Sequence, residues 1–429
     1  MNSNALGDGR DVLLSICIPT RDRRRYLEGV LEHLAGLDLP FATEVVVSDH
    51  GADGSDGLCR DFEERLNLRY LVRSPAISAF ANLYSALRGA RGRYAVYLAN
   101  DDRLFREALI AAVAWLGANP QCSAFYAPSA ETNLVDGSRG PITGHSVVPL
   151  EFAPHQRLAL TEFLLDSQIV PEWGIYRTDC FATLSENPGL YFVYHIMERA
   201  IGLGSVRFSP IPFYNSILQH FPGDARPTLG RTVIADIQTW DKYRKGLELL
   251  LASGLIGVAP EARPAVLARL TPKLDGFVNQ HKYQSFTVLL NGCRFAEALE
   301  LAKLMIGRGM AVPVDRLLLA QISLAATVDE ISRRAIERGC RDGIALYGFA
   351  SSAIAAAWMS QRPDLPIVEL PSLALDNEYL LVAWDHGGVA RALAQGWPAD
   401  RVVDFTRAYA QLDLGPWLDA FQPSALVAG

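Results

Sequence analysis

The sequence predicts an α/β protein of three successive regions, and three observations support this fold class. Residues 11–224 alternate short apolar runs with amphipathic helical patterns, as βαβ units do. Residues 225–335 keep the helical periodicity but lack strand-like alternation, and residues 336–429 return to alternating strand and helix patterns. A chain of 429 residues is also too long for one ordinary core, so several domains are expected.

The first region is predicted to begin with parallel strands. Three apolar runs, each separated from the next by helical patterns, end at Pro19, Ser48 and Ala99. The helix after the first run has apolar residues at helical spacing, namely Leu27, Val30, Leu31 and Leu34. Because ligands of open α/β sheets lie beyond the carboxyl ends of parallel strands, functional residues are expected where these runs end.

The run GRYAVYLANDDRLF ends in two adjacent carboxylates, Asp101 and Asp102. Two like charges this close repel each other, and a bound Mg²⁺ or Mn²⁺ would remove the repulsion. The same cation would stabilise negative charge on a departing diphosphate. The alternative is that Asp102 caps the next predicted helix, RLFREALIAAVAWL, so both interpretations stay open.

The ends of the first two strands are predicted to lie next to these carboxylates. Pro19, Thr20 and Arg21 end the first strand, and Asp49 ends the second. A carboxylate such as Asp49 can accept hydrogen bonds from a nucleotide base or from ribose hydroxyls. These residue types predict a nucleotide site at one edge of the sheet.

Three segments together resemble the nucleotide-sugar-binding half of family 2 glycosyltransferases of the GT-A fold. The segments are SICIPTRDRRRYLEGVLEHL, EVVVSDHGADGS and FANLYSALRGARGRYAVYLANDDRL, and the resemblance extends over about residues 11–222. It implies a GT-A domain that moves a sugar from a nucleoside diphosphate to an acceptor hydroxyl, with inversion and with help from a divalent cation. The acceptor would be a polysaccharide, a lipid-linked glycan or a protein.

The resemblance also implies roles for individual residues. It places the donor nucleotide and its phosphates against Pro19, Thr20, Arg21, Asp49, Asn82, Arg88, Asn100 and Asp101. Asp101 matches the second aspartate of the family's DxD motif, and Asp102 is the residue after it. Ala99 stands where the commonest motif has its first aspartate, which weakens the expectation of metal dependence. The metal ligands expected on this basis are Asp101, Asp102 and His220.

The general base that would accept the proton of the acceptor hydroxyl has three candidates. The family's usual Glu-Asp pair would fall on Phe192 and Val193, so this sequence lacks it there. His195 and Glu198 lie one helical turn apart in the same predicted helix. Glu172 precedes a tryptophan in a predicted loop, and each of the three could instead be an ordinary structural residue.

The last region is predicted to be a small Rossmann-like domain. Its first strand, GIALY, is followed by Gly348, the single glycine present where a dinucleotide fingerprint needs three. Bound NAD is therefore not expected, and packing or partner docking is the preferred role. An NAD-linked enzyme centred on this region is kept as a weaker alternative.

Composition and charge limit the function further. A net charge of −7 argues against nucleic acid as the main partner, although the basic run RDRRR could meet phosphate. Six widely spaced cysteines without a CxxC pair are expected to be reduced and mostly buried. With neither a signal-like start nor a long apolar stretch, the chain is expected in the cytoplasm, while association with the inner membrane face and self-association stay open.

A second hypothesis comes from a different functional class. The alanine at position 99 and the missing acidic pair also fit a scaffold that binds a nucleotide sugar or a glycan without transferring it. Sugar transfer by a glycosyltransferase is the preferred interpretation, because order and spacing of the strand-end residues agree with it.

Overall fold

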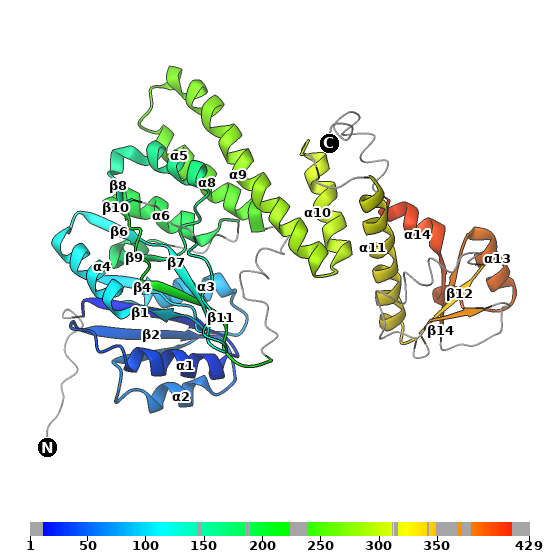
Figure 1. Cartoon of the computed structure of the whole chain (residues 1–429), viewed down its shortest axis with the longest axis horizontal. Coiled ribbons are helices and arrows are strands. Elements are labelled where there is room, and N and C mark those ends of the chain that lie inside the picture. The colour runs from blue at the N-terminus through cyan, green and yellow to red at the C-terminus, as the bar shows by residue number, and fades with distance from the viewer. Residues whose placement is uncertain are drawn as a thin grey trace. The chain divides into compact units, whose positions relative to one another are not determined.

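The computed structural model describes ten stretches of the chain (Figure 1). They are residues 12–143, 148–184, 187, 189–223, 239–310, 312, 316–340, 343–348, 367–370 and 379–413. Contacts divide the chain into two compact units, the first Met1–Leu229 with Thr239–Val278 and the second Gly230–Gln238 with Asn279–Gly429. One division therefore falls within a helix of the middle region, and the boundaries after residues 224 and 335 stay predictions.

The first unit is built on a mixed sheet. Its described strands are β1 (Leu14–Thr20), β2 (Thr43–Asp49), β3 (Leu68–Val72), β4 (Tyr94–Tyr97), β6 (Cys122–Tyr126), β8 (Leu150–Phe152), β9 (Gly174–Arg177) and β10 (Ser205–Phe208). They lie in the order β3-β2-β1-β4-β9-β6-β10-β8. As predicted, β1 to β4 are parallel, whereas β9 runs antiparallel to both of its neighbours. The carboxyl ends of β1, β2 and β4 consequently share one edge.

Helices cover both faces of this sheet. On one face, α1 (Arg24–Ala35), α2 (Ser55–Asp61) and α4 (Arg106–Ala118) share a core with apolar side chains of β1, β2 and β4. On the other, α3 (Ala79–Arg88) contacts β1 and β2, and α6 (Phe192–Leu203) contacts β6 and β10. A further helix, α5 (Arg157–Ser167), contacts β8. A sheet covered on both faces explains why β1, LSICIPT, is apolar almost throughout.

A second, smaller sheet includes the strand that directly follows the two aspartates. Its described strands lie in the order β5 (Arg103–Leu104), β11 (Tyr214–Gln219) and β7 (Ser129–Asn133). Because β5 starts directly after Asp102 and pairs with Tyr214 and Asn215, this sheet fixes the chain at the carboxyl edge of β4.

The middle region is helical, as its periodicity predicts. Its helices are α8 (Thr239–Leu255), α9 (Arg263–Asn291), α10 (Phe295–Gly307) and α11 (Arg316–Glu337). Helix α8 contacts α5 and α6 within the first unit, and α10 and α11 share a core in the second. Part of the helical region therefore completes the first unit.

The small C-terminal α/β fold is also confirmed. Strands β12 (Gly343–Tyr347), β13 (Ile367–Leu370), β14 (Tyr379–Ala383) and β15 (Val402–Asp404) form a parallel sheet in the order β13-β12-β14-β15. Helices α13 (His386–Ala394) and α14 (Phe405–Leu412) belong to the same unit. The sequence pattern also predicts a helix over residues 351–360, and these residues lie outside the described part of the chain.

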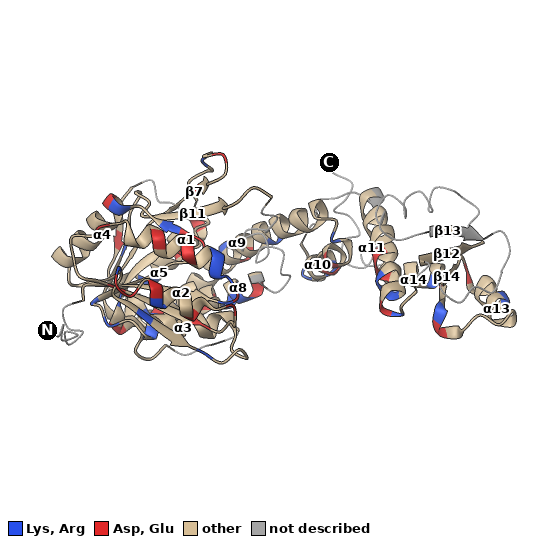
Figure 2. Ribbon diagram, turned by 90° about the horizontal axis from the view of Figure 1, so that it is seen from below, with Lys and Arg blue, Asp and Glu red and all other residues tan. Residues whose placement is uncertain are grey.

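Three general expectations can be compared with the structure. All six cysteines are unbridged, and five of them are buried. Within the described ranges, every helix is too short or too polar to cross a bilayer. Figure 2 shows Lys and Arg interspersed with Asp and Glu along the helices of the first unit.

Candidate functional site

The carboxyl ends of β1 and β2 are joined through one buried amide. Thr20 lies opposite Asp49 in the parallel register, and Asn82 of α3 lies behind both strand ends. The Asn82 Nδ2 atom donates to the backbone oxygens of Thr20 (3.1 Å) and Ser48 (2.9 Å), and its Oδ1 accepts from the Ser48 hydroxyl at 2.8 Å. Asn82 therefore has all its polar atoms engaged in holding the two strand ends together, which is a positioning role.

The end of β4 is tied to the same group of residues through Asn100. Its Nδ2 atom donates to the Thr20 hydroxyl oxygen at 2.8 Å, and its Oδ1 accepts from Arg23 Nη1 at 3.3 Å. Asn100 and Thr20 are both buried. The structure thus brings together Thr20, Asn82 and Asn100, three of the residues that the sequence assigns to the nucleotide.

Asp49 is a buried carboxylate that is held in place by its own neighbours. Its Oδ1 accepts from the Gly51 amide at 2.7 Å and its Oδ2 accepts from the Tyr70 hydroxyl at 2.6 Å. Burial and the Asp49 charge raise the pKa of Tyr70, so this hydroxyl stays a donor. Each carboxylate oxygen has a second lone pair, which leaves Asp49 able to accept from a ligand.

The positive charge beside the two aspartates is Arg23. Its Nη1 atom lies 3.0 Å from Asp101 Oδ2, and the two side chains are 27% and 18% exposed respectively. The Asp101 carboxylate is therefore partly open to solvent and is oriented by a guanidinium at the beginning of α1. Because Arg23 also bonds Asn100, one cation connects the aspartates to the β1 end.

Asp102 does not cap the following helix, so that alternative is wrong. Helix α4 begins at Arg106 with Phe105 as its N-terminal flanking residue. Instead, Asp102 accepts from the Tyr214 hydroxyl at 2.8 Å and from the Ile217 amide at 2.8 Å, both on β11. Burial, and then the charge of Asp101, raise the pKa of Asp102 to about 8. A nearby cation would lower it again.

The raised pKa of Asp102 predicts how stability depends on pH. A raised folded-state pKa gives stability that is complete below the ordinary pKa and is lost as pH rises through the folded value. Between about pH 4 and pH 8, the wild-type free energy of unfolding should therefore fall relative to Asp102→Asn, by on the order of 5 kcal/mol at about 1.4 kcal/mol for each unit of the pKa change. Urea unfolding of both proteins at pH 5, 7 and 9 tests this, with the exposed Asp56→Asn as control. Parallel pH profiles for wild type and Asp102→Asn would contradict it.

Tyr97, the last residue of β4, lies among the acidic groups of the site. Its pKa is raised by burial and then by the charges of Asp102, Asp101 and Glu172, while Arg23 lowers it. The Glu172 charge likewise contributes to the raised pKa of Asp102. The structure therefore brings one base candidate, Glu172, into the electrostatic neighbourhood of the two aspartates.

Glu172 is clamped by two tyrosines. It accepts hydrogen bonds from the hydroxyls of Tyr191 and Tyr243, the second at 3.1 Å, and the two rings stack with centroids 3.8 Å apart. Both tyrosines are buried, and Tyr243 comes from α8. Burial raises the pKa of Glu172 against the opposing effect of these hydrogen bonds. A carboxylate with a raised pKa is a stronger proton acceptor.

The other two base candidates lie on α6 in a different setting. The His195 ring packs edge to face against the Tyr84 ring of α3, with ring centroids 6.3 Å apart. Burial, followed by the charge of Arg199, lowers the pKa of His195, and Glu198 opposes this shift. The leading causes of the pKa shifts of Asp102 and Tyr97 do not include His195 or Glu198. Their assignment as base stays a prediction, and Glu172 has the stronger structural support.

The remaining predicted residues lie at different distances from this group. Pro19 is within β1, and Arg21 directly follows it with an exposed side chain 3.6 Å from Asp22. His220 follows β11 and meets Tyr26 of α1 edge to face, with ring centroids 5.2 Å apart. Arg88 lies in the last turn of α3, six residues or about 9 Å of helix beyond Asn82. It lines a separate pocket, described below.

The residues present can accommodate a divalent cation, but only as part of its ligand shell. Among the described residues, no three His, Cys, Asp or Glu side chains come together as a metal cluster. Mg²⁺ and Mn²⁺ bound with nucleotides commonly use one or two carboxylates, with phosphate oxygens and water completing the shell. Asp101 and Asp102 supply this minimal set, and the raised pKa of Asp102 indicates a site where positive charge is favoured.

Sequence reasoning missed several residues that build the site. Arg23 lies within the basic run RDRRR, which was noted only as a general phosphate contact. Tyr97 ends an apolar strand, while Tyr191, Tyr214 and Tyr243 lie between 19 and 112 residues away from the carboxylates they contact. A lone tyrosine in a sequence carries no signal for such long-range partners. The basic run was the one usable signal.

Comparison with known proteins finds a family model that matches part of the chain. Residues 15–181 match the model for "Glycosyl transferase family 2". A curated relative, "Putative teichuronic acid biosynthesis glycosyltransferase TuaG" of Bacillus subtilis (strain 168), is 27% identical over 100 residues. That alignment covers 23% of this chain and 39% of the relative, so the chain spans about two fifths of the relative's length.

Two solved structures are similar to the chain at low identity. S. aureus TarS 1-349 in complex with UDP-GlcNAc is 17% identical, with 68% of this chain and 89% of that chain covered and a TM-score of 0.39. The mannosyltransferase PcManGT from Pyrobaculum calidifontis, in complex with GDP-Man and Mn²⁺, is 15% identical, with 63% and 86% covered and a TM-score of 0.37.

Proposed function

Since residues 15–181 form a glycosyl transferase family 2 domain, we propose that the protein transfers a sugar from a nucleoside diphosphate to an acceptor hydroxyl, with inversion. The observation that carries this proposal is the acidic group of Asp101, Asp102 and Glu172 around Tyr97, in which the ring of Trp173, next to Glu172, meets the Tyr214 ring that donates to Asp102. This acidic group lies at the sheet edge where Thr20 and Asp49 end adjacent strands. An edge of this kind is where open α/β sheets bind nucleotides.

The donor nucleotide would lie along the ends of β1 and β2. Asp49 supplies an acceptor for the base or the ribose, since each of its oxygens keeps a second lone pair. Thr20 and Asn100 hold each other in place, and Asn82 keeps the two strand ends at a fixed separation. Arg21 is exposed beside them and is able to reach a phosphate. Arg88 lies about 9 Å further along α3 than Asn82, and its contact with the nucleotide stays a prediction.

Asp101 would be the main protein ligand of a divalent cation, with Asp102 behind it, whereas the predicted ligand His220 does not join the two aspartates in a three-residue metal cluster. When bound, such a cation supplies positive charge that stabilises the departing diphosphate. Arg23 keeps the Asp101 carboxylate in one orientation. Tyr214 and the Ile217 amide do the same for Asp102. The chain thus fixes its two carboxylates before any ligand arrives.

Glu172 would be the general base. In a direct displacement, the acceptor oxygen bonds to the anomeric carbon as the bond from that carbon to the diphosphate oxygen breaks. The proton of the acceptor hydroxyl passes to a Glu172 oxygen, and the bonding electrons leave with the diphosphate. The two tyrosine hydroxyls hold the Glu172 carboxylate in one orientation, and burial raises its pKa toward a useful value.

Ligand-induced stabilisation tests the proposed donor class. We expect a screen of nucleoside diphosphate sugars with Mn²⁺ to raise the melting temperature for at least one donor, because a ligand that binds only the native state stabilises it. At 100 times Kd the gain in unfolding free energy is about 2.7 kcal/mol. Adding EDTA should remove most of the shift. If every nucleotide sugar leaves the melting temperature unchanged at millimolar concentration, the proposal is wrong.

One specific feature favours a second candidate, a scaffold that binds a nucleotide sugar or a glycan without transferring it. Ala99 replaces the first aspartate of the usual motif, and Phe192 and Val193 stand where the family's acidic pair is expected. A scaffold would show donor-induced stabilisation without release of the nucleoside diphosphate. In the preferred proposal, the acceptor would be a polysaccharide, a lipid-linked glycan or a protein. The enzyme would act in the cytoplasm, where contact with the inner membrane face and self-association would both be open to it.

A further inference from the structure

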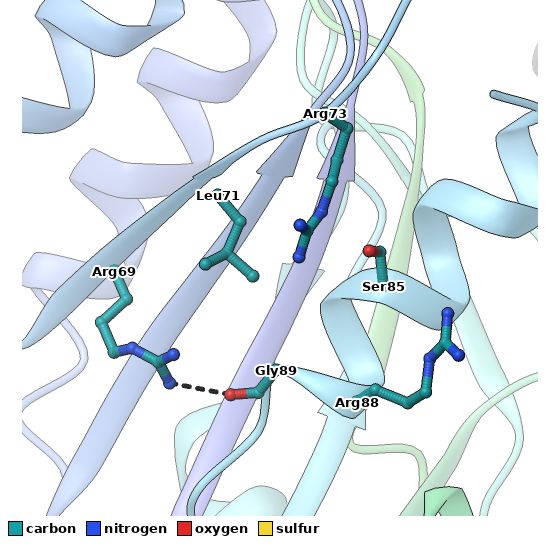
Figure 3. Close-up of a pocket in the computed structure, with 6 residues that line it drawn as sticks. All are labelled: Arg69, Leu71, Arg73, Ser85, Arg88 and Gly89. Atoms are coloured by element: carbon teal, nitrogen blue, oxygen red, sulfur yellow. Dashed lines mark hydrogen bonds between the residues drawn. The ribbon is translucent and has the colours of Figure 1, made fainter. Parts of the chain in front are cut away.

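A pocket lies between the edge strand β3 and helix α3 (Figure 3). Its volume is about 300 Å³, and its lining consists of Arg69, Leu71, Arg73, Ser85, Arg88 and Gly89. Alternation along β3 turns the first three of these toward α3, because residues two apart share one face of a strand. The pocket therefore has three guanidinium groups and one hydroxyl around it.

Only one of the three arginines is neutralised. Arg69 Nη1 lies 3.2 Å from Glu44 Oε2 and also donates to the Gly89 carbonyl oxygen at 2.7 Å. Glu44 is buried and is itself fixed by the Ser15 hydroxyl and the Arg91 amide. Arg69 is thus a structural cation on one wall of the pocket, and Glu44 has little capacity left for its neighbours.

Arg73 and Arg88 have no carboxylate partner among the residues that the structure describes. The Nε atom of Arg73 is buried without a hydrogen-bond acceptor. Arg88 donates from Nε to the Tyr84 carbonyl oxygen at 3.3 Å, so its two Nη groups stay available. Figure 3 shows Arg73 reaching in from the end of β3, with Arg69 on the strand side and Arg88 on the helix side. Within the described part of the chain, the buried Nε of Arg73 lacks an acceptor, and the exposed Arg88 adds a second positive charge without a carboxylate partner, so an anion would complete the pocket.

We propose that this pocket binds a phosphate group, as a ligand separate from the sugar donor. Guanidinium forks match the geometry of phosphate oxygens better than any other cationic side chain, and the Ser85 hydroxyl offers a further donor. A volume of about 300 Å³ leaves room for the group that the phosphate esterifies. The proposal does not depend on the transferase reaction, because none of the lining residues belongs to the acidic group around Tyr97.

Binding of pyrophosphate to the full chain tests the proposal. In EDTA, which keeps metal-assisted binding at the aspartates out of the measurement, calorimetry should show saturable binding to the wild type. Arg73→Gln and Arg88→Gln should each weaken this binding at least tenfold, and the double variant should abolish it. Arg60→Gln removes an equal charge from α2, where Arg60 pairs with Asp56, and should change nothing. Binding that is undetectable in the wild type, or equal in the double variant, overturns the proposal.

Further measurements show whether weaker pyrophosphate binding comes from a loss of fold stability or from the loss of charge alone. Both single variants should have melting temperatures close to that of the wild type without phosphate, because neither gives up an ion pair and Arg88 gives up one hydrogen bond, to the Tyr84 carbonyl oxygen at 3.3 Å. Arg73→Lys keeps the charge without the planar fork and should weaken pyrophosphate binding by less than Arg73→Gln. If UDP and GDP compete with pyrophosphate in EDTA, the pocket is part of the donor site and the proposal of a separate ligand fails.

The source of the phosphate can be a free ion or a lipid headgroup, and the two can be distinguished. Flotation with vesicles of phosphatidylglycerol, against vesicles of phosphatidylcholine, measures recognition of a lipid phosphodiester. If the wild type floats with phosphatidylglycerol vesicles but not with phosphatidylcholine vesicles, and the double variant floats with neither, the pocket binds a lipid headgroup at a membrane surface. If the wild type binds pyrophosphate but floats with neither kind of vesicle, the pocket binds a free phosphate. Whichever source is correct, the double variant should lose the binding that the wild type shows.

Discussion

Replacing Asp101 by asparagine should abolish sugar transfer, lowering kcat by on the order of 10³-fold. The substitution keeps the shape of the side chain but removes the charge that would hold a divalent cation next to the departing diphosphate. Donor-induced stabilisation should also lose its dependence on Mn²⁺. Initial rates with and without Mn²⁺, together with melting temperatures, measure both effects.

Two controls make the Asp101 result interpretable. Asp56→Asn removes an equally charged but exposed carboxylate on α2 and should leave kcat and donor binding unchanged. Arg23→Gln removes the ion pair that orients Asp101 and should lower kcat by less than Asp101→Asn does. Near-normal turnover by Asp101→Asn would show that this carboxylate takes no part in the reaction.

Glu172→Gln should lower kcat by about 10²- to 10⁴-fold while donor affinity stays within twofold of wild type. The reason is that a glutamine amide accepts no proton, although it can still hydrogen-bond to Tyr191 and Tyr243. In the wild type, kcat should rise with pH as Glu172 ionises, and burial places that rise above the ordinary pKa of a glutamate. Rates measured from pH 4 to pH 9 test both statements.

Variants of the clamp and of the competing candidates test whether Glu172 is the base. Tyr243→Phe removes one hydrogen bond to Glu172 and should shift the rise of kcat to higher pH, since that bond favours the charged carboxylate. His195→Gln and Glu198→Gln should retain most of the activity. If either of these two, rather than Glu172→Gln, abolishes turnover at unchanged donor affinity, then the base lies on α6.

Local patterns were sufficient to predict most of the fold of both units. The run LSICIPT is buried on both faces, and Leu27, Val30, Leu31 and Leu34 form the buried side of α1, as their spacing predicts. The three strands GIALY, YLLVA and VVD were likewise readable from their apolar composition. Burial of apolar side chains determines such elements, and it acts over short stretches that a sequence displays directly.

The candidate site was predictable only in part, because its geometry depends on distant contacts. Strand ends indicated Thr20, Asp49 and Asn100, and parallel pairing was enough to bring them together. Nothing local showed that Asp102 would bond to β11 instead of capping α4. The capping interpretation failed because a buried carboxylate is satisfied by whichever donors the tertiary fold supplies.

The clearest example of a non-local feature is the clamp on Glu172. Its hydroxyl donors lie 19 and 71 residues further along the chain, and one belongs to α8 in the helical middle region. Periodicity assigned that region to helices but gave no sign that a helix would supply a residue next to the acidic group. For Arg88 the role toward the nucleotide stays a prediction, and its place in a pocket beside β3 was not readable from the sequence either.

Release of the nucleoside diphosphate tests the central claim most directly. The full chain is incubated with a panel of nucleoside diphosphate sugars and Mn²⁺, and the released nucleotide is measured for wild type, Asp101→Asn and Glu172→Gln. Transfer at the acidic group around Tyr97 predicts release from at least one donor by the wild type, suppression by EDTA, and loss in both variants. Saturable donor binding without any release, across the panel and with a range of acceptors present, would contradict it and identify a binding scaffold.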